Sequence, residues 1–354
     1  MVSVHEHVIE LPKRIVIGSG VLKSVGKIFR DLQLGEPILI VTGPHVVKMY
    51  ADLLIGSLEE AGYREIYTFI ARDATRATAE NAVTAAKEYK VKTIIGFGGG
   101  KSIDVAKYTA HVANSAFVSI PTAASHDGIA SPFASLKGIS RPYSVKARTP
   151  IAIIADTKII AKAPRRLLIA GAGDLIAKLT AVRDWRLAHR LKGEYYGEYA
   201  ASLALLSAKH VIKYASIIRH GGEEAARIVV EGLISSGVAM CIAGSTRPAS
   251  GSEHLFSHAL DMLAPKPALH GEQVALGTIM MMYLHGGNWR AVRATMKRLG
   301  LPVTAKELGI EDSIIIKALT IAHKIRPERY TILGESGLTW EAAEKLARIT
   351  KVIE

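Results

Sequence analysis

The chain has 354 residues, a formal net charge of +13 at pH 7 and a hydrophobic content of 49%. That length is enough for two domains with separate cores, and the hydrophobic content excludes an intrinsically disordered chain. A single cysteine, Cys241, excludes an internal disulfide framework and a cysteine-rich metal site. Lysines and arginines occur singly or in pairs along helical segments, which favours solvated helix faces over a nucleic-acid-binding surface.

Two apolar patterns bear on the membrane and on targeting. The N-terminus, MVSVHEHVIELPKR, lacks the apolar core of a signal peptide, so we expect a cytoplasmic protein. The longest strongly apolar run, Val274–Leu284, is too short to span a bilayer and predicts a buried helix.

The first half of the chain alternates short apolar strands with helices. The expected strands are 14–18, 38–42, 65–70, 93–95 and 117–120, and the expected helices are 21–32, 44–61, 79–89 and one that begins at 101–104. Continuous apolar strands separated by helices are typical of a parallel sheet covered on both faces. Two further strands, 143–146 and 151–155, are predicted to pair with each other and close this domain.

From about residue 161 the strand patterns almost vanish and helical periodicity dominates. The expected helices are 167–192, 199–219, 225–243, 274–284, 289–299 and 341–353. We therefore predict an α/β protein with a Rossmann-like, parallel-sheet nucleotide domain at 1–160 and an all-helical domain at 161–354. Pro164 and the glycines at 171 and 173 mark the boundary, and the cleft between the halves is the expected site.

A glycine-rich turn follows the strand at 93–95. It reads GFGGGKSID over residues 96–104, and a helix begins within it. Glycines let backbone N–H groups approach an anion and a helix N-terminus adds the positive end of its dipole, so the turn predicts a pyrophosphate site. The motif is a variant, because Gly96 and Gly100 are too close for a P-loop and Lys101 replaces the last glycine of GxGxxG. The alternative is a tight turn without a ligand, although four glycines exceed what such a turn requires.

A second polar segment, PTAASHDGIAS at 121–131, follows the strand at 117–120. Its small and hydroxyl residues surround one acid, Asp127. Because ligands in such sheets bind beyond the carboxyl ends of the strands, we expect this segment to contact the ribose and nicotinamide of a dinucleotide. The alternative is a polar surface loop.

The end of the strand at 38–42 bears on the choice of dinucleotide. Dinucleotide-binding proteins that are specific for NAD usually have an Asp or Glu near the end of the second strand, where it forms a hydrogen bond with the ribose 2′-hydroxyl. Here the strand ends in Gly43-Pro44-His45, with no carboxylate. We predict that NADH and NADPH are both accepted.

Four residues of the helical half suggest metal chemistry. Asp174 follows the two glycines near the expected start of a helix, and His270 precedes another glycine. His254 and His258 are four residues apart and so lie on one helix face. Two imidazoles and a carboxylate suit a zinc ion with positions left open for substrate. Taken singly, each histidine is more often a capped or solvated residue.

These segments together resemble the superfamily of iron-containing alcohol dehydrogenases, glycerol dehydrogenases and dehydroquinate synthases. Its members carry a Gly-Gly-Gly-x-Ser-x-x-Asp turn in an N-terminal nucleotide domain and have a helical C-terminal domain. The corresponding turn here is GGGKSID at 98–104. Within the superfamily, the loop PTAASHDGIASP at 121–132 is similar to that of the sn-glycerol-1-phosphate dehydrogenase family. The resemblance covers essentially the whole chain.

The resemblance implies roles for individual residues. The NAD or NADP contacts would be Gly100, Lys101, Ser102, Ile103, Asp104, Thr122, Ala123, Ala124, Ser125 and Ser131. One Zn²⁺ per subunit would be bound by Asp174, His254 and His270, with Asp174 also touching the substrate. Asp127 and His258 would bind substrate and are the two candidate proton donors.

The implied reaction is the reversible reduction of dihydroxyacetone phosphate by NADH or NADPH to sn-glycerol 1-phosphate, the backbone of archaeal membrane lipids, by a homo-oligomer. A glycerol or other polyol dehydrogenase on the same scaffold is the main alternative. A dehydroquinate-type synthase is less favoured because that enzyme has a longer sequence. A non-catalytic nucleotide-binding protein would not need the metal-ligand set. The lysine or arginine that binds the substrate phosphate is left open.

Overall fold

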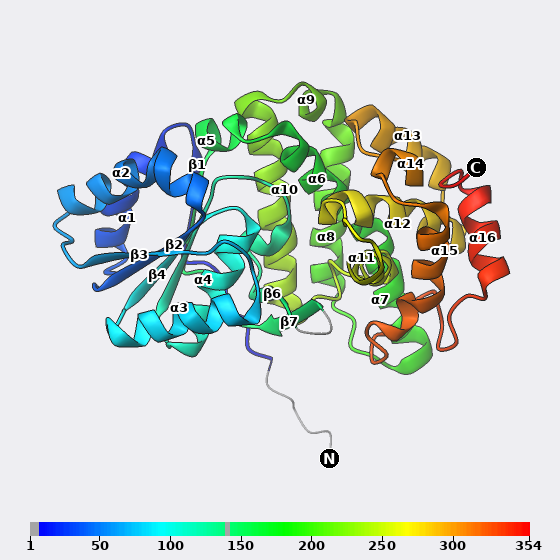
Figure 1. Ribbon diagram of the computed structural model, residues 1–354, viewed down its shortest axis with the longest axis horizontal. Coiled ribbons are helices and arrows are strands. Elements are labelled where there is room, and N and C mark those ends of the chain that lie inside the picture. The colour runs from blue at the N-terminus through cyan, green and yellow to red at the C-terminus, as the bar shows by residue number, and fades with distance from the viewer. Residues whose placement is uncertain (1–6, 139–141) are drawn as a thin grey trace, which may run out of the picture.

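The computed structural model describes residues 7–138 and 142–354 (Figure 1). Its main sheet has six parallel strands in the order β1-β8-β5-β4-β2-β3. The strands are β1 (Arg14–Gly18), β2 (Ile38–Thr42), β3 (Ile66–Ile70), β4 (Thr93–Gly98), β5 (Ala116–Pro121) and β8 (Ala152–Asp156). The predicted parallel sheet is confirmed, and the carboxyl ends of its strands meet at one edge.

Helices cover both faces of this sheet. They are η1 (Val21–Ser24), α1 (Val25–Asp31), α2 (Pro44–Glu60), α3 (Arg76–Glu88) and α4 (Gly100–Val112). Successive strand residues point to opposite faces, so Ile38 and Ile40 of β2 pack in the core beneath α1 and α2. Leu39 and Val41 belong to the core beneath α3 and α4. Burial on both sides explains why β2 is apolar at almost every position, and each such side chain contributes about 1.5–3 kcal/mol.

The predicted pairing of the strands at 143–146 and 151–155 is wrong. β7 (Pro142–Lys146) instead pairs antiparallel with β6 (Phe133–Lys137), which the sequence reading missed. β8 lies within the main sheet, between β1 and β5. The residues of β8 are all buried, whereas those of β6 alternate between buried and exposed. A strand that is apolar on both faces, such as β8, is typical of a parallel sheet with helices on both sides. A strand in which buried and exposed side chains alternate, such as β6, is typical of an antiparallel pair with one face in solvent.

The chain after β8 is helical throughout and forms the other side of the molecule in Figure 1. The helices are α5 (Thr157–Lys162), α6 (Arg165–Ile176), α7 (Lys178–Lys192), α8 (Glu198–Lys213), α9 (Ala215–His220), α10 (Gly222–Ala243), α11 (Ser252–Leu263), α12 (His270–Leu284), α13 (Trp289–Leu299), α14 (Ala305–Leu308), α15 (Asp312–Ile321), η3 (Ala322–Lys324) and α16 (Trp340–Ile349). Each predicted helical segment is present, two of them divided in the middle. The domain boundary at residue 160 stays a prediction.

Two long apolar helices form the centre of the helical half. Among the described residues, α10 is the one helix long and apolar enough to cross a membrane, but 72% of its most apolar window is buried inside the protein. That burial identifies α10 as a core helix. The predicted buried helix at 274–284 is confirmed as part of α12, whose residues from Gly271 to Met282 are all buried.

Candidate active site

The turn between β4 and α4 requires glycine for two separate reasons. Gly98 has a φ of +153°, and a Cβ atom there would lie 2.8 Å from the hydroxyl oxygen of Ser102. A Cβ at Gly100 would lie 1.9 Å from Nε2 of His126, which comes from the loop after β5. No side chain of a described residue caps the N-terminus of α4, so its first backbone N–H groups are available to an anion.

A cavity of about 690 Å³ joins this turn to the helical half. The predicted cofactor residues that line it are Gly100, Lys101, Ser102, Asp104, Ala123, Ser125 and Ser131. Ile103, Thr122 and Ala124 are buried behind the cavity lining, and their predicted contacts remain a prediction. Asp104 is 4% exposed, and its Oδ1 atom has no hydrogen-bond partner among the described residues.

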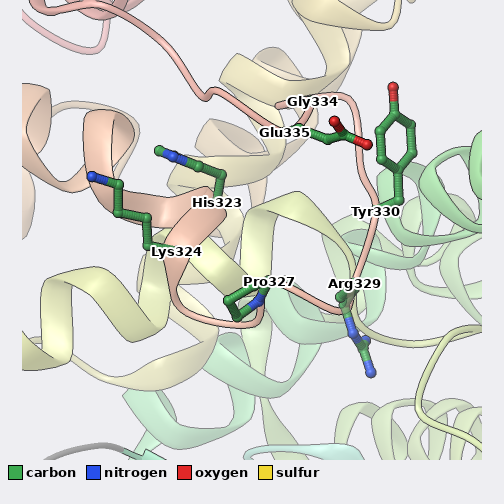
Figure 2. A pocket seen from close by; sticks show the side chains of 7 residues that line it. All are labelled: His323, Lys324, Pro327, Arg329, Tyr330, Gly334 and Glu335. Carbon is green, nitrogen blue, oxygen red and sulfur yellow. The ribbon is translucent and has the colours of Figure 1, made fainter.

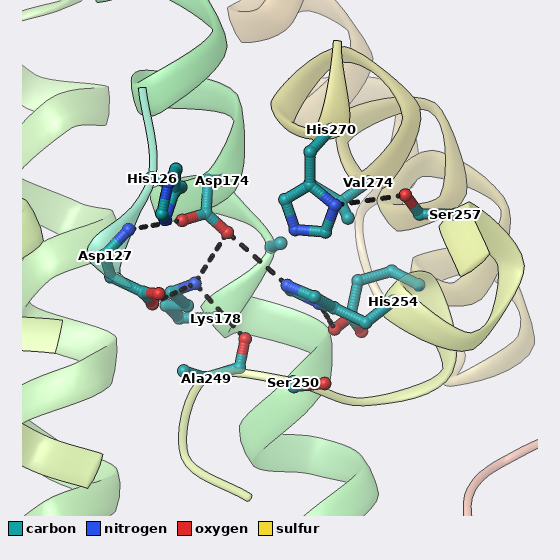
Figure 3. A network of polar contacts seen from close by, with 12 residues as sticks. His126, Asp127, Asp174, Lys178, Ala249, Ser250, His254, Ser257, His270 and Val274 are labelled. Carbon is teal, nitrogen blue, oxygen red and sulfur yellow. Dashed lines mark hydrogen bonds and ion pairs between the residues drawn. The ribbon is translucent and has the colours of Figure 1, made fainter. Parts of the chain in front are cut away.

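At the other end of this cavity His254 and His270 line its wall, and Asp174, which is buried and does not line it, lies beside them (Figure 3). One potential ligand atom from each lies within 4.8 Å of the other two. Nε2 of His254 is 3.5 Å from Oδ1 of Asp174, and the rings of His254 and His270 are 5.0 Å apart. The three residues therefore lie close together, and their role as metal ligands stays a prediction.

The two preceding glycines suggested that Asp174 lies near the start of a helix, and this prediction is wrong. Asp174 lies in the last turn of α6, and the glycines are inside that helix. A Cβ at Gly173 would be 2.5 Å from the carbonyl oxygen of Gly271, and a Cβ at Gly271 would be 1.9 Å from that of Ala170. Glycine at both positions permits the close approach of α6 and α12 that brings Asp174 beside His270.

Burial and neighbouring charges set the protonation of the triad. Burial disfavours the charged form of Asp174, but Lys178 and His254 outweigh this and hold the pKa of that carboxyl well below its ordinary value. Burial and the charge of His254 lower the pKa of His270 to about 3. An ionised carboxylate and a neutral imidazole are the forms that bind a metal cation, and Asp174 and His270 are held in these forms. Burial also disfavours the charged form of His254, but its contacts with Asp174 and Glu253 outweigh that effect, so its pKa is instead raised.

Glu253 orients His254 and was missed by the sequence reading. Its Oε1 atom lies 2.6 Å from Nδ1 of His254, which leaves Nε2 on the side of Asp174. Glu253 is completely buried and also accepts hydrogen bonds from Gly251 N and Thr180 Oγ1. A carboxylate behind a histidine is a usual support for a metal-binding imidazole.

Lys178 is the second buried charge that the sequence reading missed. Its ammonium nitrogen lies 2.9 Å from Asp174 Oδ1 and 2.8 Å from Asp127 Oδ2 (Figure 3). It also donates to the carbonyl oxygen of Ala249. The signal available in the sequence was the i,i+4 spacing from Asp174, which places opposite charges together across one helical turn.

Asp127 and His258 both line the cavity near the triad. The backbone N–H of Asp127 donates to Asp174 Oδ2, and Ser236 Oγ donates to Asp127 Oδ2. His258 lies one turn after His254 on α11, with its ring 6.0 Å from that of His270. Burial lowers the pKa of His258, and its Nδ1 atom has no hydrogen-bond partner among the described residues.

A third missed residue, Lys107, fixes the loop that carries Asp127. This lysine is completely buried in α4 and donates to the carbonyl oxygens of Gly128 and Phe133. Its ammonium nitrogen is 3.5 Å from Oδ1 of Asp104. Asp127–Ile129 forms the short helix η2 within this loop.

A second hollow, of about 350 Å³, lies in the segment around and after η3 (Figure 2). It is lined by His323, Lys324, Pro327, Arg329, Tyr330, Gly334 and Glu335. None of the predicted site residues lines it, so the larger cavity is the candidate active site.

Comparison with known proteins gives the family. Residues 16–164 match the family model described as iron-containing alcohol dehydrogenase. Over 98% of this chain and 99% of the relative, the sequence is 64% identical to glycerol-1-phosphate dehydrogenase [NAD(P)+] of Hyperthermus butylicus. The chain belongs to the glycerol-1-phosphate dehydrogenase family. The enzyme of that name from Aeropyrum pernix is 60% identical, again over 98% of this chain and 99% of the relative.

Solved structures show the same fold at much lower identity. A probable glycerol dehydrogenase from Sinorhizobium meliloti superposes with a TM-score of 0.80 and is 20% identical, covering 99% of this chain and 100% of that one. The predicted fold class, a parallel-sheet nucleotide half followed by a helical half, is therefore confirmed.

Proposed function

We propose that this protein reversibly reduces dihydroxyacetone phosphate to sn-glycerol 1-phosphate with NADH or NADPH. The observation that carries the proposal is one cavity with the glycine turn at one end and the Asp174, His254 and His270 group at the other. The full-length identity of 64% to a glycerol-1-phosphate dehydrogenase supports this reading over the polyol dehydrogenase alternative. The glycerol dehydrogenase structure is only 20% identical, so its likeness concerns the fold alone.

The proposed metal is one Zn²⁺ per subunit, held by Asp174, His254 and His270. Three protein ligands of these types, spaced within 4.8 Å, fit a catalytic zinc site that keeps room for substrate. The Glu253 carboxylate behind His254 is further support, because it fixes which imidazole nitrogen faces the ligand group. A zinc ion at this position polarises a substrate carbonyl as a Lewis acid.

The glycine turn and the loop after β5 are proposed to hold the nicotinamide cofactor. The uncapped N-terminus of α4 suits the pyrophosphate, and Ser125 and Ser131 offer hydroxyl groups along the cavity wall. Together these groups would orient the cofactor for hydride transfer to the substrate.

The alkoxide that forms at C2 must receive a proton, and Asp127 and His258 are the proposed donors. Both side chains line the cavity beside the triad. Ser236 and Lys178 both donate to the Asp127 carboxylate, so Asp127 would have to take up a proton before it could act as the donor. A positioned donor of either kind contributes typically 10²–10⁴-fold to such a proton transfer.

Three wider features also belong to the proposal. The product would supply the glycerol backbone of archaeal membrane lipids, and the protein would act as a homo-oligomer. The domain boundary is placed at residues 160 and 161, a position supported by the end of the main sheet at Asp156.

The test is to incubate the zinc-loaded protein with dihydroxyacetone phosphate and NADH and to identify the product. We expect one equivalent of NADH oxidised per equivalent of glycerol phosphate. We also expect a product that sn-glycerol-3-phosphate dehydrogenase does not oxidise. Complete oxidation by that enzyme would refute the proposed stereochemistry, and failure to consume the ketone would refute the reaction.

A further inference from the structure

Arg326 comes from a different half of the chain than the other cationic side chains that line the active-site cavity. The lysine and arginine side chains that line it, among the described residues, are Arg72, Lys101, Lys137 and Arg326. The first three come from the nucleotide half, after β3, within α4 and at the end of β6. Arg326 alone comes from the helical half, two residues after η3.

Several contacts place Arg326 at the metal end of the cavity. The short helix η3 packs against α11, which carries His254 and His258. Burial is the main cause of the lowered pKa of His258, and the positive charge of Arg326 is a smaller cause. Arg326 must therefore lie near His258. The ring of His258 is 6.0 Å from that of His270. Arg326 therefore lies on the substrate side, away from the glycine turn.

The guanidinium group of Arg326 makes no hydrogen bond or ion pair with another described residue, and burial lowers its pKa. Two other arginines of this region, Arg247 and Arg329, have hydrogen-bond or ion-pair partners within the protein. Arg247 forms an ion pair with Glu194, and Arg329 donates to Ser250 O and Thr246 Oγ1 at 2.5 Å each. Figure 2 shows that Arg329 points away from the other residues of the smaller hollow. A partly buried cation without a partner is costly, and an anionic ligand offsets that cost.

Two residues with hydroxyl groups line the cavity in a segment bound by Arg329. Burial is the main cause of the lowered pKa of Arg329, and the charge of Arg326 is close enough to contribute to it. The two residues are Thr246 and Ser250, and both belong to the segment before α11 that Arg329 holds. Because Thr246 Oγ1 accepts a hydrogen bond from Arg329, its own proton is available to a ligand. A guanidinium group flanked by hydroxyl donors is suited to a phosphate.

We propose that Arg326 binds the phosphate of the substrate, assisted by the hydroxyl groups of Thr246 and Ser250. This inference rests on the proposed function. In dihydroxyacetone phosphate one carbon and one oxygen separate C2 from phosphorus, so the phosphate site must lie close to the metal ligands. Arg326 then sets the preference for a phosphorylated over an unphosphorylated ketone, because the phosphate contributes binding energy that helps to orient C2.

The experiment compares Arg326→Met and Arg326→Lys with the wild type and with Lys324→Met. Lys324 is an exposed cation two residues away that does not line the cavity, so its variant controls for loss of charge. For each protein, kcat/KM is measured with dihydroxyacetone phosphate and with dihydroxyacetone at saturating NADH. Inhibition by inorganic phosphate and the thermal unfolding midpoint are measured on the same samples.

We expect Arg326→Met to lower kcat/KM for the phosphorylated ketone by ~10²-fold or more, and that for dihydroxyacetone by less than ~3-fold. Phosphate inhibition should weaken in parallel. Arg326→Lys should fall between wild type and Arg326→Met, and Lys324→Met should match wild type. An equal loss on both ketones, or an unchanged preference in Arg326→Met, would overturn the inference. A wild type without any preference would overturn the proposed function as well.

Discussion

The ammonium nitrogen of Lys178 lies 2.9 Å from Oδ1 of Asp174, four residues earlier in the chain. Both side chains are almost completely buried, and the same ammonium reaches Asp127 at 2.8 Å. One lysine therefore forms ion pairs with two carboxylates, of which one is a proposed metal ligand and the other a proposed proton donor. Without it, two negative charges would face each other in a poorly hydrated site.

Lys178→Met should strongly destabilise the metal-free protein. Removing one partner of a buried ion pair leaves an uncompensated charge and costs about 3–5 kcal/mol. Lys192→Met is the matched control on the same helix, because Lys192 pairs with Glu335 on the surface. Such an exposed pair is worth at most about 1 kcal/mol. Chemical denaturation of both variants at neutral pH, after chelation of metal, measures the difference, and equal losses would contradict the assignment.

The Lys178→Met penalty should also depend on pH. The folded pKa of Asp174 is lowered, so the stabilisation from its carboxylate is present above its unfolded pKa and is lost as pH falls through the folded value. In Lys178→Met that lowering is reduced, because the main opposing positive charge is gone. The stability difference between wild type and variant should therefore shrink below about pH 4, the ordinary range of an aspartate. A difference that grows on acidification would be inconsistent with this account.

The sequence predicted the parallel sheet and the shared helix face of two candidate site residues because both follow local rules, while the roles of the site residues stay predictions. β1 and β2 have the predicted bounds, since unbroken apolar runs between helices have few alternatives in a parallel sheet. His254 and His258 share a helix face because their spacing is one turn. Asp174 and His270 come close together only because α6 packs tightly against α12. Local patterns do not show this packing, so the prediction that these residues act together came from the family resemblance.

The missed features depend on contacts between distant segments. β6 was not predicted, because its partner, β7, comes later in the chain and the hairpin lies outside the main sheet. Gly171 and Gly173 were interpreted as markers of the domain boundary, whereas each allows another backbone to approach α6 closely. Lys178 and Lys107 looked like ordinary solvated helix cations. Burial alone distinguishes them from the many exposed lysines, and burial is a property of the folded chain.

Gly271→Ala should separate the two helices that carry the metal ligands. The added methyl group would lie 1.9 Å from the carbonyl oxygen of Ala170, a backbone atom that can yield only if the helices move apart. Overpacking of this kind costs typically 1–3 kcal/mol, and the displacement should weaken zinc binding through His270. Gly56→Ala is the control, because its methyl group would meet nothing within 4 Å. Competition titration against a chelator should show weaker zinc binding for Gly271→Ala alone; equal affinities would refute this packing role.

His270→Ala should leave a folded protein with little zinc and little turnover. The imidazole supplies one of three proposed ligands, and its lowered pKa, about 3, keeps it neutral at physiological pH. His220→Ala, at an exposed position on α9, is the comparison. Elemental analysis after dialysis gives the zinc content, and circular dichroism checks the fold. Full zinc and full activity in His270→Ala would remove His270 from the site.

NADH and NADPH should bind within about tenfold of each other, which corresponds to ~1.4 kcal/mol. β2 ends at Thr42, and the residues that follow, Gly43, Pro44 and His45, line the cavity without a carboxylate. An absent acid removes repulsion toward a 2′-phosphate. Fluorescence titration of the two reduced cofactors gives both dissociation constants. A thousandfold preference for NADH would contradict the reading of this turn.

The most direct test of the proposed function is the ratio of kcat/KM for dihydroxyacetone phosphate to that for dihydroxyacetone, measured with the same zinc-loaded enzyme and NADH. A site with donors for a phosphate leaves them unpaired when that group is missing, and this sharpens the rejection of the smaller ketone. We predict a ratio of at least ~10², equivalent to ~2.7 kcal/mol of transition-state binding. A ratio near one would contradict the account and would make the protein a polyol dehydrogenase.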